Sequence, residues 1–467
     1  MINRARVATG AVPGAAAGIL LRCPSLEKFM EKTRFFKDIC DRTLDNGLKL
    51  ICLKKTGAPV VSVQLWYRTG SANEHDGIRG ISHFFEHMMF RGSKNVGPEE
   101  HARRINDVGG HYNAFTAEDV TAYLNSVPKD CLDMVLSLES DRMNDLIINE
   151  KVLETERNVI VEEFQTYMNN PLTKAFLEFR KEFFKNHPYE YSALGRLEDI
   201  RSISVADCMA YYRKWYAPDN AMLVIVGDFD SSEAVFDKVQ SNFKRHEKRA
   251  NGTAEIIADQ PAHRTLWMKR DVDFDVPVCV VGYPAPPASD KDALPLEILQ
   301  LIISQGESSR MHREIVRKRS LAVMAGGMNQ SLKRSGMSLF FAVFTPNVAQ
   351  HRVEEAIMKQ IDAVRTQGIT EYEMEKVKNS VLTNRVYEMY SSDHICQKLA
   401  YSEAIEGDYH LWVERLSALE TMSVETLMRA AQRYWVESGR HTLYLKPKKV
   451  NPLLFAAGIF RKLLPQR

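Results

Sequence analysis

Hydrophobic and polar positions follow two different periods along the chain, and each period predicts a different kind of element. Runs rich in β-branched and aromatic residues predict strands, chiefly at Val60–Tyr67, Ala221–Val226 and Val278–Tyr283. Apolar residues at helical spacing predict long helices at Pro128–Leu146, Asn149–Met168, Val348–Thr366 and Thr370–Tyr390. Strands mixed with long helices favour an α+β fold built from layers.

The pattern of the first half recurs in the second half. Ser204–Trp215 and the strand after it resemble Ser423–Trp435 and its strand, and the two helices begin 219 positions apart. We therefore predict two homologous domains, each an antiparallel-rich sheet with helices on one face. The expected division is a tail or targeting segment (1–38), a first domain (39–245), a polar linker (246–264), a second domain (265–450) and a C-terminal tail (451–467).

Composition narrows the class of protein. The 467 residues carry a formal net charge of +2, so no global field indicates a nucleic acid or a membrane surface as partner. No run of about 18 apolar residues is present, and no membrane span is expected. Seven scattered cysteines without a C-x-x-C pair predict neither a disulfide framework nor a cysteine zinc site. Residues 1–33 fit a tail, which we favour, a secretory signal or a transit segment.

The candidate chemistry begins at His83-Phe84-Phe85-Glu86-His87. In a helix, His83 and His87 lie one turn apart on one face, and two neutral imidazoles suit zinc. Glu86 lies beside them and can take a proton from a metal-bound water. The order H-x-x-E-H is the inverse of the common zinc-protease motif. The alternative is a pair of core histidines bonded to backbone, with a surface glutamate.

A catalytic zinc needs a third protein ligand, and four carboxylates of the Asn149–Met168 helix are candidates: Glu154, Glu156, Glu162 and Glu163. Glu156 and Glu163 are seven residues apart and so share nearly one face. That pair fits one ligand and one supporting carboxylate, but an amphipathic helix also carries solvated glutamates. The residues alone do not rank the four.

A family resemblance ranks them. The motif followed by Glu163, 76 residues after His87, resembles the pitrilysin/insulinase metallopeptidases, in their two-domain form similar to the mitochondrial processing peptidase β subunit and bacterial zinc peptidases. Further blocks agree over about residues 40–450: Asp45–Leu48, Gly80–His83, Glu86–Gly92, Gly109–Tyr123, His187–Tyr189 and Tyr216–Asn220.

The resemblance implies a zinc endopeptidase for unfolded or extended peptides, in which this chain forms half of a clam-like chamber. Its Zn²⁺ ligands would be His83, His87 and Glu163. Glu86 would be the general base, and Glu156 a catalytic-site carboxylate outside the ligand set. The substrate would pair with an edge strand at Asn113, Ala114 and Thr116.

The chain departs from the family pattern in its second half. Relatives hold the substrate carbonyl with a Tyr and an Arg seven residues earlier. Tyr283 resembles the Tyr, but Val276 stands at the Arg position and Arg270 has the wrong spacing. The missing Arg indicates either that a partner subunit supplies the clamp or that the activity is modest. Relatives of this length work as homodimers or heterodimers, so the resemblance implies a second copy or a related subunit as partner. A subunit that is inert alone and a non-catalytic scaffold are the rival hypotheses. The compartment stays open: bacterial cytoplasm or periplasm is favoured over a mitochondrial location.

Overall fold

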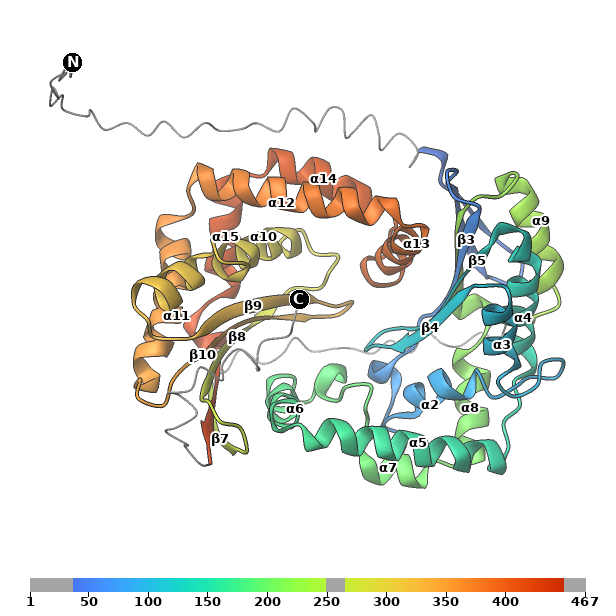
Figure 1. Cartoon of the computed structure of the whole chain (residues 1–467), viewed down its shortest axis with the longest axis horizontal. Coiled ribbons are helices and arrows are strands. Elements are labelled where there is room, and N and C mark those ends of the chain that lie inside the picture. Colours follow the sequence, from blue (N-terminus) through green and yellow to red (C-terminus); the bar gives the residue numbers. More distant parts are fainter. Residues whose placement is uncertain (1–36, 249–264, 449–467) are drawn as a thin grey trace, which may run out of the picture.

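The computed structural model describes residues 37–248 and 265–448. Nearly all of the two predicted tails and of the predicted linker therefore lies outside the described residues. Two domains, each built on one sheet, face each other (Figure 1). The predicted α+β fold with two related domains is confirmed. Within the described ranges, no helix is both long and apolar enough to cross a membrane.

The first domain contains a six-stranded sheet. Its strands, in spatial order, are β1 (Cys40–Thr43), β2 (Lys49–Lys54), β6 (Ala221–Gly227), β3 (Val60–Tyr67), β5 (Thr121–Pro128) and β4 (His111–Thr116). Only β2 and β6 run parallel, and the other neighbours are antiparallel. The strand β4 ends the sheet, which leaves its outer edge free of strand partners among the described residues.

The second domain repeats this topology without the first strand. Its order is β7 (Leu266–Val272), β11 (His441–Pro447), β8 (Val278–Ala285), β10 (Gly336–Val343) and β9 (Met324–Ser331). The one parallel pair, β7 with β11, corresponds to β2 with β6, and the end strand β9 corresponds to β4. The duplication predicted from the sequence is therefore present in the strand order.

Helices follow the predicted spacing, and several begin at a side-chain cap. Those of the first domain are α2 (Ile81–Met88), α3 (Glu100–Asp107), α4 (Leu132–Asp145), α5 (Glu150–Asn169), α6 (Pro171–Phe183), α7 (Leu197–Ser202), α8 (Val205–Trp215) and α9 (Ser232–Phe243). Those of the second are α10 (Ala293–Ser304), α11 (Gln350–Gln367), α12 (Glu371–Tyr390), α13 (Ser392–Tyr401), α14 (Leu411–Thr421) and α15 (Val424–Tyr434). Asn149 caps α5 by accepting from the Val152 amide, and Thr370 with Glu373 forms a capping box on α12.

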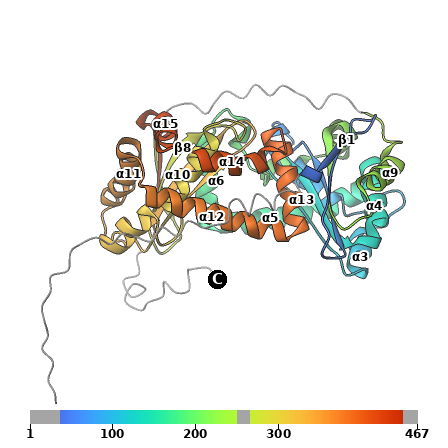
Figure 2. The same cartoon turned by 90° about the horizontal axis from the view of Figure 1, so that it is seen from above.

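Each domain also sends one helix to the far face of the other domain's sheet. From the second domain, α13 places Ile395 and Leu399 in one apolar cluster with Trp66 of β3. From the first domain, α6 places Phe179 and Phe183 against the second sheet. Figure 2 shows α6 among elements of the second domain and α13 beside the first. Each sheet is thus covered on both faces. Helices of its own domain cover one face, and a helix from the other domain, α6 or α13, packs on the other.

A buried polar cluster also joins the domains beside β4. Asp119, in the turn after β4, is 4% exposed and accepts from the Tyr189 hydroxyl at 2.6 Å. The same carboxylate forms an ion pair with Arg334 and accepts from the Lys333 amide, both from the turn between β9 and β10. This cluster fixes the end of the edge strand to the second domain.

Candidate metal centre

The helix α2 is positioned by a carboxylate that precedes it in the chain. Gly80 begins the helix with φ of 106°, in the left-handed region that glycine adopts at little cost. The Glu74 carboxylate accepts from the Gly80 and Ser82 amides at 2.7 and 2.9 Å, which satisfies donors left open at the helix start. Burial raises the pKa of Glu74 to about 7, although these hydrogen bonds oppose the shift.

Three side chains from α2 and α5 meet at one point: His83, His87 and Glu163. The two histidine Nε2 atoms are 3.3 Å apart, and the Glu163 Oε2 lies 3.7 Å from His83 and 3.5 Å from His87. A tetrahedral ion with bonds of about 2.0–2.2 Å separates its donors by about 3.3–3.6 Å. The donor set fits zinc in both chemistry and spacing.

Glu156 lies behind this group. Its carboxylate is 0% exposed, contacts His87 Nδ1 at 3.3 Å and forms an ion pair with Arg91. An acceptor beside Nδ1 favours the tautomer that carries its proton on Nδ1. The Nε2 atom then has a free lone pair that can bind a metal. Burial would raise the pKa of Glu156, but the bonds from His87 and Arg91 outweigh it and lower the pKa.

The other two candidate carboxylates on α5 point elsewhere. Glu154 is exposed and pairs with Arg157 at 2.9 Å, and Glu162 is exposed. Of the four glutamates that the sequence left open, the structure therefore brings Glu156 and Glu163 to the histidines.

The two histidines have different environments. Burial, with a smaller contribution from His87, lowers the pKa of His83 to about 4, which keeps it neutral. Burial also opposes the charged form of His87, but Glu156, Glu163 and Glu86 outweigh burial and raise its pKa. Three carboxylates around one imidazole make this point favourable for a cation.

Glu86 lines a pocket of about 450 Å³ together with His83, Thr116 and Glu163. Burial raises the pKa of Glu86, while hydrogen bonds from the Thr116 hydroxyl and amide moderate the rise. A raised pKa suits a carboxylate that must hold a proton during a reaction and then release it. Thr116 is at the end of β4, so the edge strand and the carboxylate share one wall of the pocket.

The predicted substrate strand lies at that wall. Asn113 is exposed on β4, and its side-chain oxygen accepts from the Ala114 amide at 2.9 Å. The outer edge of β4 can pair with an extended chain, because main-chain groups of an end strand lack a neighbour on that side.

Tyr283 does not reach the pocket, which corrects the expectation that it binds substrate. Its side chain is 0% exposed in the core of the second domain, and its hydroxyl contacts Met358 Sδ at 3.3 Å on α11. Val276 is buried too, and Arg270 pairs with Glu178 on the surface at 2.7 Å. Within the described ranges, this chain therefore does not assemble the expected carbonyl clamp.

Two residues that complete the site were not singled out from the sequence. Arg91 lies beyond the end of α2 at Met88, so helical spacing from His87 does not identify it. Glu74 acts from outside the helix, and no local pattern identifies it.

Family models match both halves of the chain. Residues 50–196 match the model described as "Insulinase (Peptidase family M16)", and residues 202–381 match "Peptidase M16 inactive domain". The chain belongs to the M16 peptidase family. This assignment agrees with the structure, because within the described residues the metal-binding group lies in the first half and the second half matches the inactive domain.

Named M16 relatives are similar over most of the chain. "Zinc protease PqqE" from Helicobacter pylori is 28% identical over 87% of this chain and 92% of its own. A probable mitochondrial-processing peptidase subunit beta from Arabidopsis thaliana is 22% identical over 84% of this chain and 75% of its own. The crystal structure of a protease from Helicobacter pylori is 26% identical with a TM-score of 0.79, covering 88% and 99% of the two chains. These relatives support a zinc metallopeptidase.

Proposed function

We propose that this M16 protein is a zinc-dependent endopeptidase that hydrolyses unfolded or extended peptides, with Glu86 as the general base. One observation carries the proposal: two imidazoles and one carboxylate lie at the spacing of a tetrahedral metal, in the pocket that Glu86 also lines. A scaffold has no need of such a group, because the buried His83 has an Nδ1 atom without a hydrogen-bond partner among the described residues, and an unsatisfied buried polar atom is costly.

In this mechanism His83, His87 and Glu163 would hold the ion, and Glu156 would keep His87 in the required tautomer. Zinc, when bound, would act as a Lewis acid and make water a good nucleophile near neutral pH. Glu86 takes the proton of the attacking water and returns it to the departing amine. Its raised pKa suits the second of these steps.

The substrate would add a strand to β4 through its main chain, at Asn113, Ala114 and Thr116. Main-chain pairing requires an extended peptide and reads little of its sequence. The Asn113 side chain, which occupies the Ala114 amide in the free protein, would move aside when a peptide binds. We therefore expect broad cleavage of unfolded polypeptides and resistance of folded ones.

A partner chain is the second part of the proposal. Tyr283 and Val276 are buried and Arg270 is on the surface, so the carbonyl clamp would come from another subunit. A relative named as a subunit of the mitochondrial-processing peptidase supports pairing, either as a homodimer or with a related chain. In either assembly this chain would form half of a closed chamber.

The deciding experiment compares Glu86→Gln with the unsubstituted protein. We expect one zinc per chain in both, and a fall in cleavage of an unfolded polypeptide by about 10²–10⁴-fold in the variant. Glu162→Gln, on the exposed side of α5, is the matched control and should cleave normally. Normal cleavage by Glu86→Gln would reject the base. Absence of zinc and of cleavage at every protein concentration, alone or with a related chain, would reject the function.

A further inference from the structure

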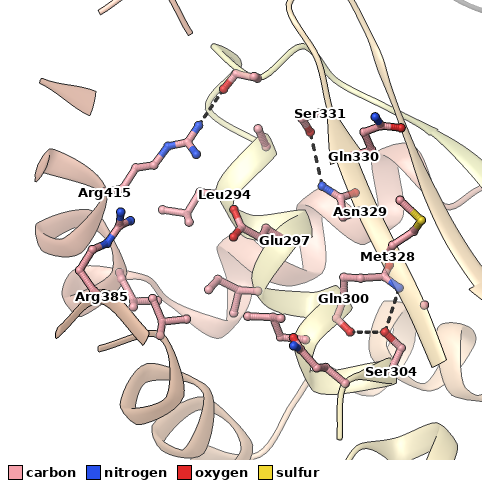
Figure 3. Close-up of a pocket in the computed structure, with 18 of the residues that line it drawn as sticks. Leu294, Glu297, Gln300, Ser304, Met328, Asn329, Gln330, Ser331, Arg385 and Arg415 are labelled. Carbon is pink, nitrogen blue, oxygen red and sulfur yellow. Dashed lines mark hydrogen bonds between the residues drawn. The ribbon is translucent and has the colours of Figure 1, made fainter. Parts of the chain in front are cut away.

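The second domain contains a pocket of about 670 Å³ in the place that corresponds to the metal site (Figure 3). In the first domain, the metal pocket lies between α2, the edge strand β4, α5 and α6. In the second domain, the pocket is lined from α10, the edge strand β9, α12 and α13, and α14 adds a further wall. Since α10 follows β8 as α2 follows β3, the duplication has produced two equivalent pockets.

The pocket has lost the chemistry of its counterpart. On α10, Glu297, Gln300 and Leu301 line it with the same spacing as the two histidines and the base in the first domain. Leucine cannot bind a metal, and the Gln300 amide donates to Leu339 O and Ser304 Oγ, both at 2.9 Å. The position equivalent to the base thus has a structural role, and the pocket does not repeat the His–Glu–His set of the first domain.

The pocket nevertheless keeps a charge on each of two walls. From α12, Arg385 has a side chain that is 14% exposed, contacts Glu388 at 3.2 Å and lies 5.0 Å over the Trp412 ring. Burial lowers the pKa of Arg385, which shows that its neighbours replace only part of its hydration. Among the described residues its side chain makes one hydrogen bond, from Nη1 to the Glu388 carboxylate, which leaves its other N–H groups available to a ligand.

The opposite wall carries Glu297, whose exposed carboxylate has no hydrogen bond or ion pair in the described part of the chain. Figure 3 shows Glu297 and Arg385 directed into the same space from opposite sides. They influence each other electrostatically but are too far apart to form an ion pair. The other charged residues that line the pocket are already matched, because Arg415 pairs with Glu406 at 2.9 Å and Lys398 pairs with Glu388 at 3.0 Å.

We propose that this pocket binds the two ends of a short zwitterionic peptide. Arg385 would receive the carboxylate through its free N–H donors, an arrangement that guanidinium groups favour. Glu297 would receive the ammonium group, and apolar side chains such as Leu294 and Leu416 would contact the body of the peptide. The volume lies in the usual range for small-ligand pockets. The proposal rests on the proposed function only for the source of such peptides, which a peptidase releases.

Calorimetric titration with three peptides tests the proposal without cleavage, in the Glu86→Gln protein loaded with zinc. The probes are trialanine, N-acetyl-trialanine and trialanine amide, which remove one terminal charge at a time. We expect trialanine to bind, and each blocked peptide to bind at least about tenfold more weakly, since each loses a charged hydrogen bond. Failure of trialanine to bind at millimolar concentration would overturn the proposal, whether or not the unsubstituted protein cleaves peptides.

Variants then locate the site. Arg385→Met should weaken trialanine binding about tenfold and abolish the difference between trialanine and its amide. Glu297→Gln should abolish the difference between trialanine and its N-acetyl form. Arg317→Met, an exposed arginine paired with Glu307, is the control and should bind normally.

Unchanged binding in both pocket variants, or loss of binding in His83→Ala alone, would place the peptide at the metal pocket and overturn the proposal. Zinc content and thermal unfolding check that the variants fold. If Arg385→Met does not fold, Arg385→Lys and the blocked peptides still give a decision.

Discussion

Replacing Glu156 with glutamine tests how the metal site is held together. The amide can still accept from His87 Nδ1, but it has no negative charge and cannot also satisfy Arg91 as a carboxylate does. Arg91 keeps its ion pair with Glu99 and is 31% exposed, so it can turn towards solvent without unfolding the protein. The perturbation is therefore expected to act on the orientation and basicity of His87.

Loss of a partner of this kind weakens metal binding by about 10–100-fold, or about 1.4–2.7 kcal/mol. We expect the Glu156→Gln protein to show that increase in the zinc dissociation constant, measured by competition with a chromogenic chelator. At saturating zinc, its cleavage rate should approach that of the unsubstituted protein, because Glu156 does not line the pocket.

The reasoning would be refuted by zinc affinity within twofold of the unsubstituted protein. It would be refuted equally by a rate that stays low after zinc saturation, which would give Glu156 a direct part in the chemistry. Glu154→Gln, on the same helix and exposed, provides the baseline for both measurements.

Three further predictions concern other parts of the chain. Glu163→Gln should lose zinc at neutral pH, which metal analysis after dialysis would show; full occupancy would reject Glu163 as a ligand. Glu373 is buried, which would raise its pKa, but bonds from Arg310 and the Thr370 amide outweigh this and lower the pKa from 4.5 to about 2. The bonds to the ionised carboxylate therefore stabilise the fold above pH 4.5, and this stabilisation is lost as the pH falls towards 2. Glu373→Gln should lower the free energy of unfolding by about 3 kcal/mol at pH 7 and by little near pH 2, as measured by denaturant unfolding. A loss of stability that does not change with pH would contradict this. Asp119→Asn and Arg334→Met should each destabilise the protein and couple in a double-mutant cycle by about 1–3 kcal/mol; additive effects would show that the pair does not join the domains.

The sequence predicted the elements that carry local signals. The helices predicted at Asn149–Met168 and Thr370–Tyr390 begin where expected, and in the structure the Asn149 and Thr370 side chains cap them. The histidine pair and Glu163 were predicted on separate helices, and the structure brings them together. Spacing alone could not choose among the glutamates of α5, because one residue rotates a side chain by about 100° and the helix orientation depends on packing.

Long-range packing explains what the sequence left out. Helix α6 was not predicted, although Pro171 begins it and proline is favoured at a first helical position. The exchange of α6 and α13 depends on two domains meeting, which no local pattern shows. Tyr283 stands in a family-like context, but only the packing of α11 decides that its side chain is covered.

The exchange of α6 and α13 makes the two halves mutually obligatory. If the chain were divided after residue 248, each domain alone would expose the apolar sheet face that the other domain's helix covers. Neither domain should therefore fold as a stable, non-aggregating protein by itself. The same exchange should keep the halves associated after the backbone is severed between residues 248 and 265. The two copies of the duplicated domain thus depend on each other for folding. The second copy is therefore retained for the stability of the first, although its described residues contain no metal-binding group.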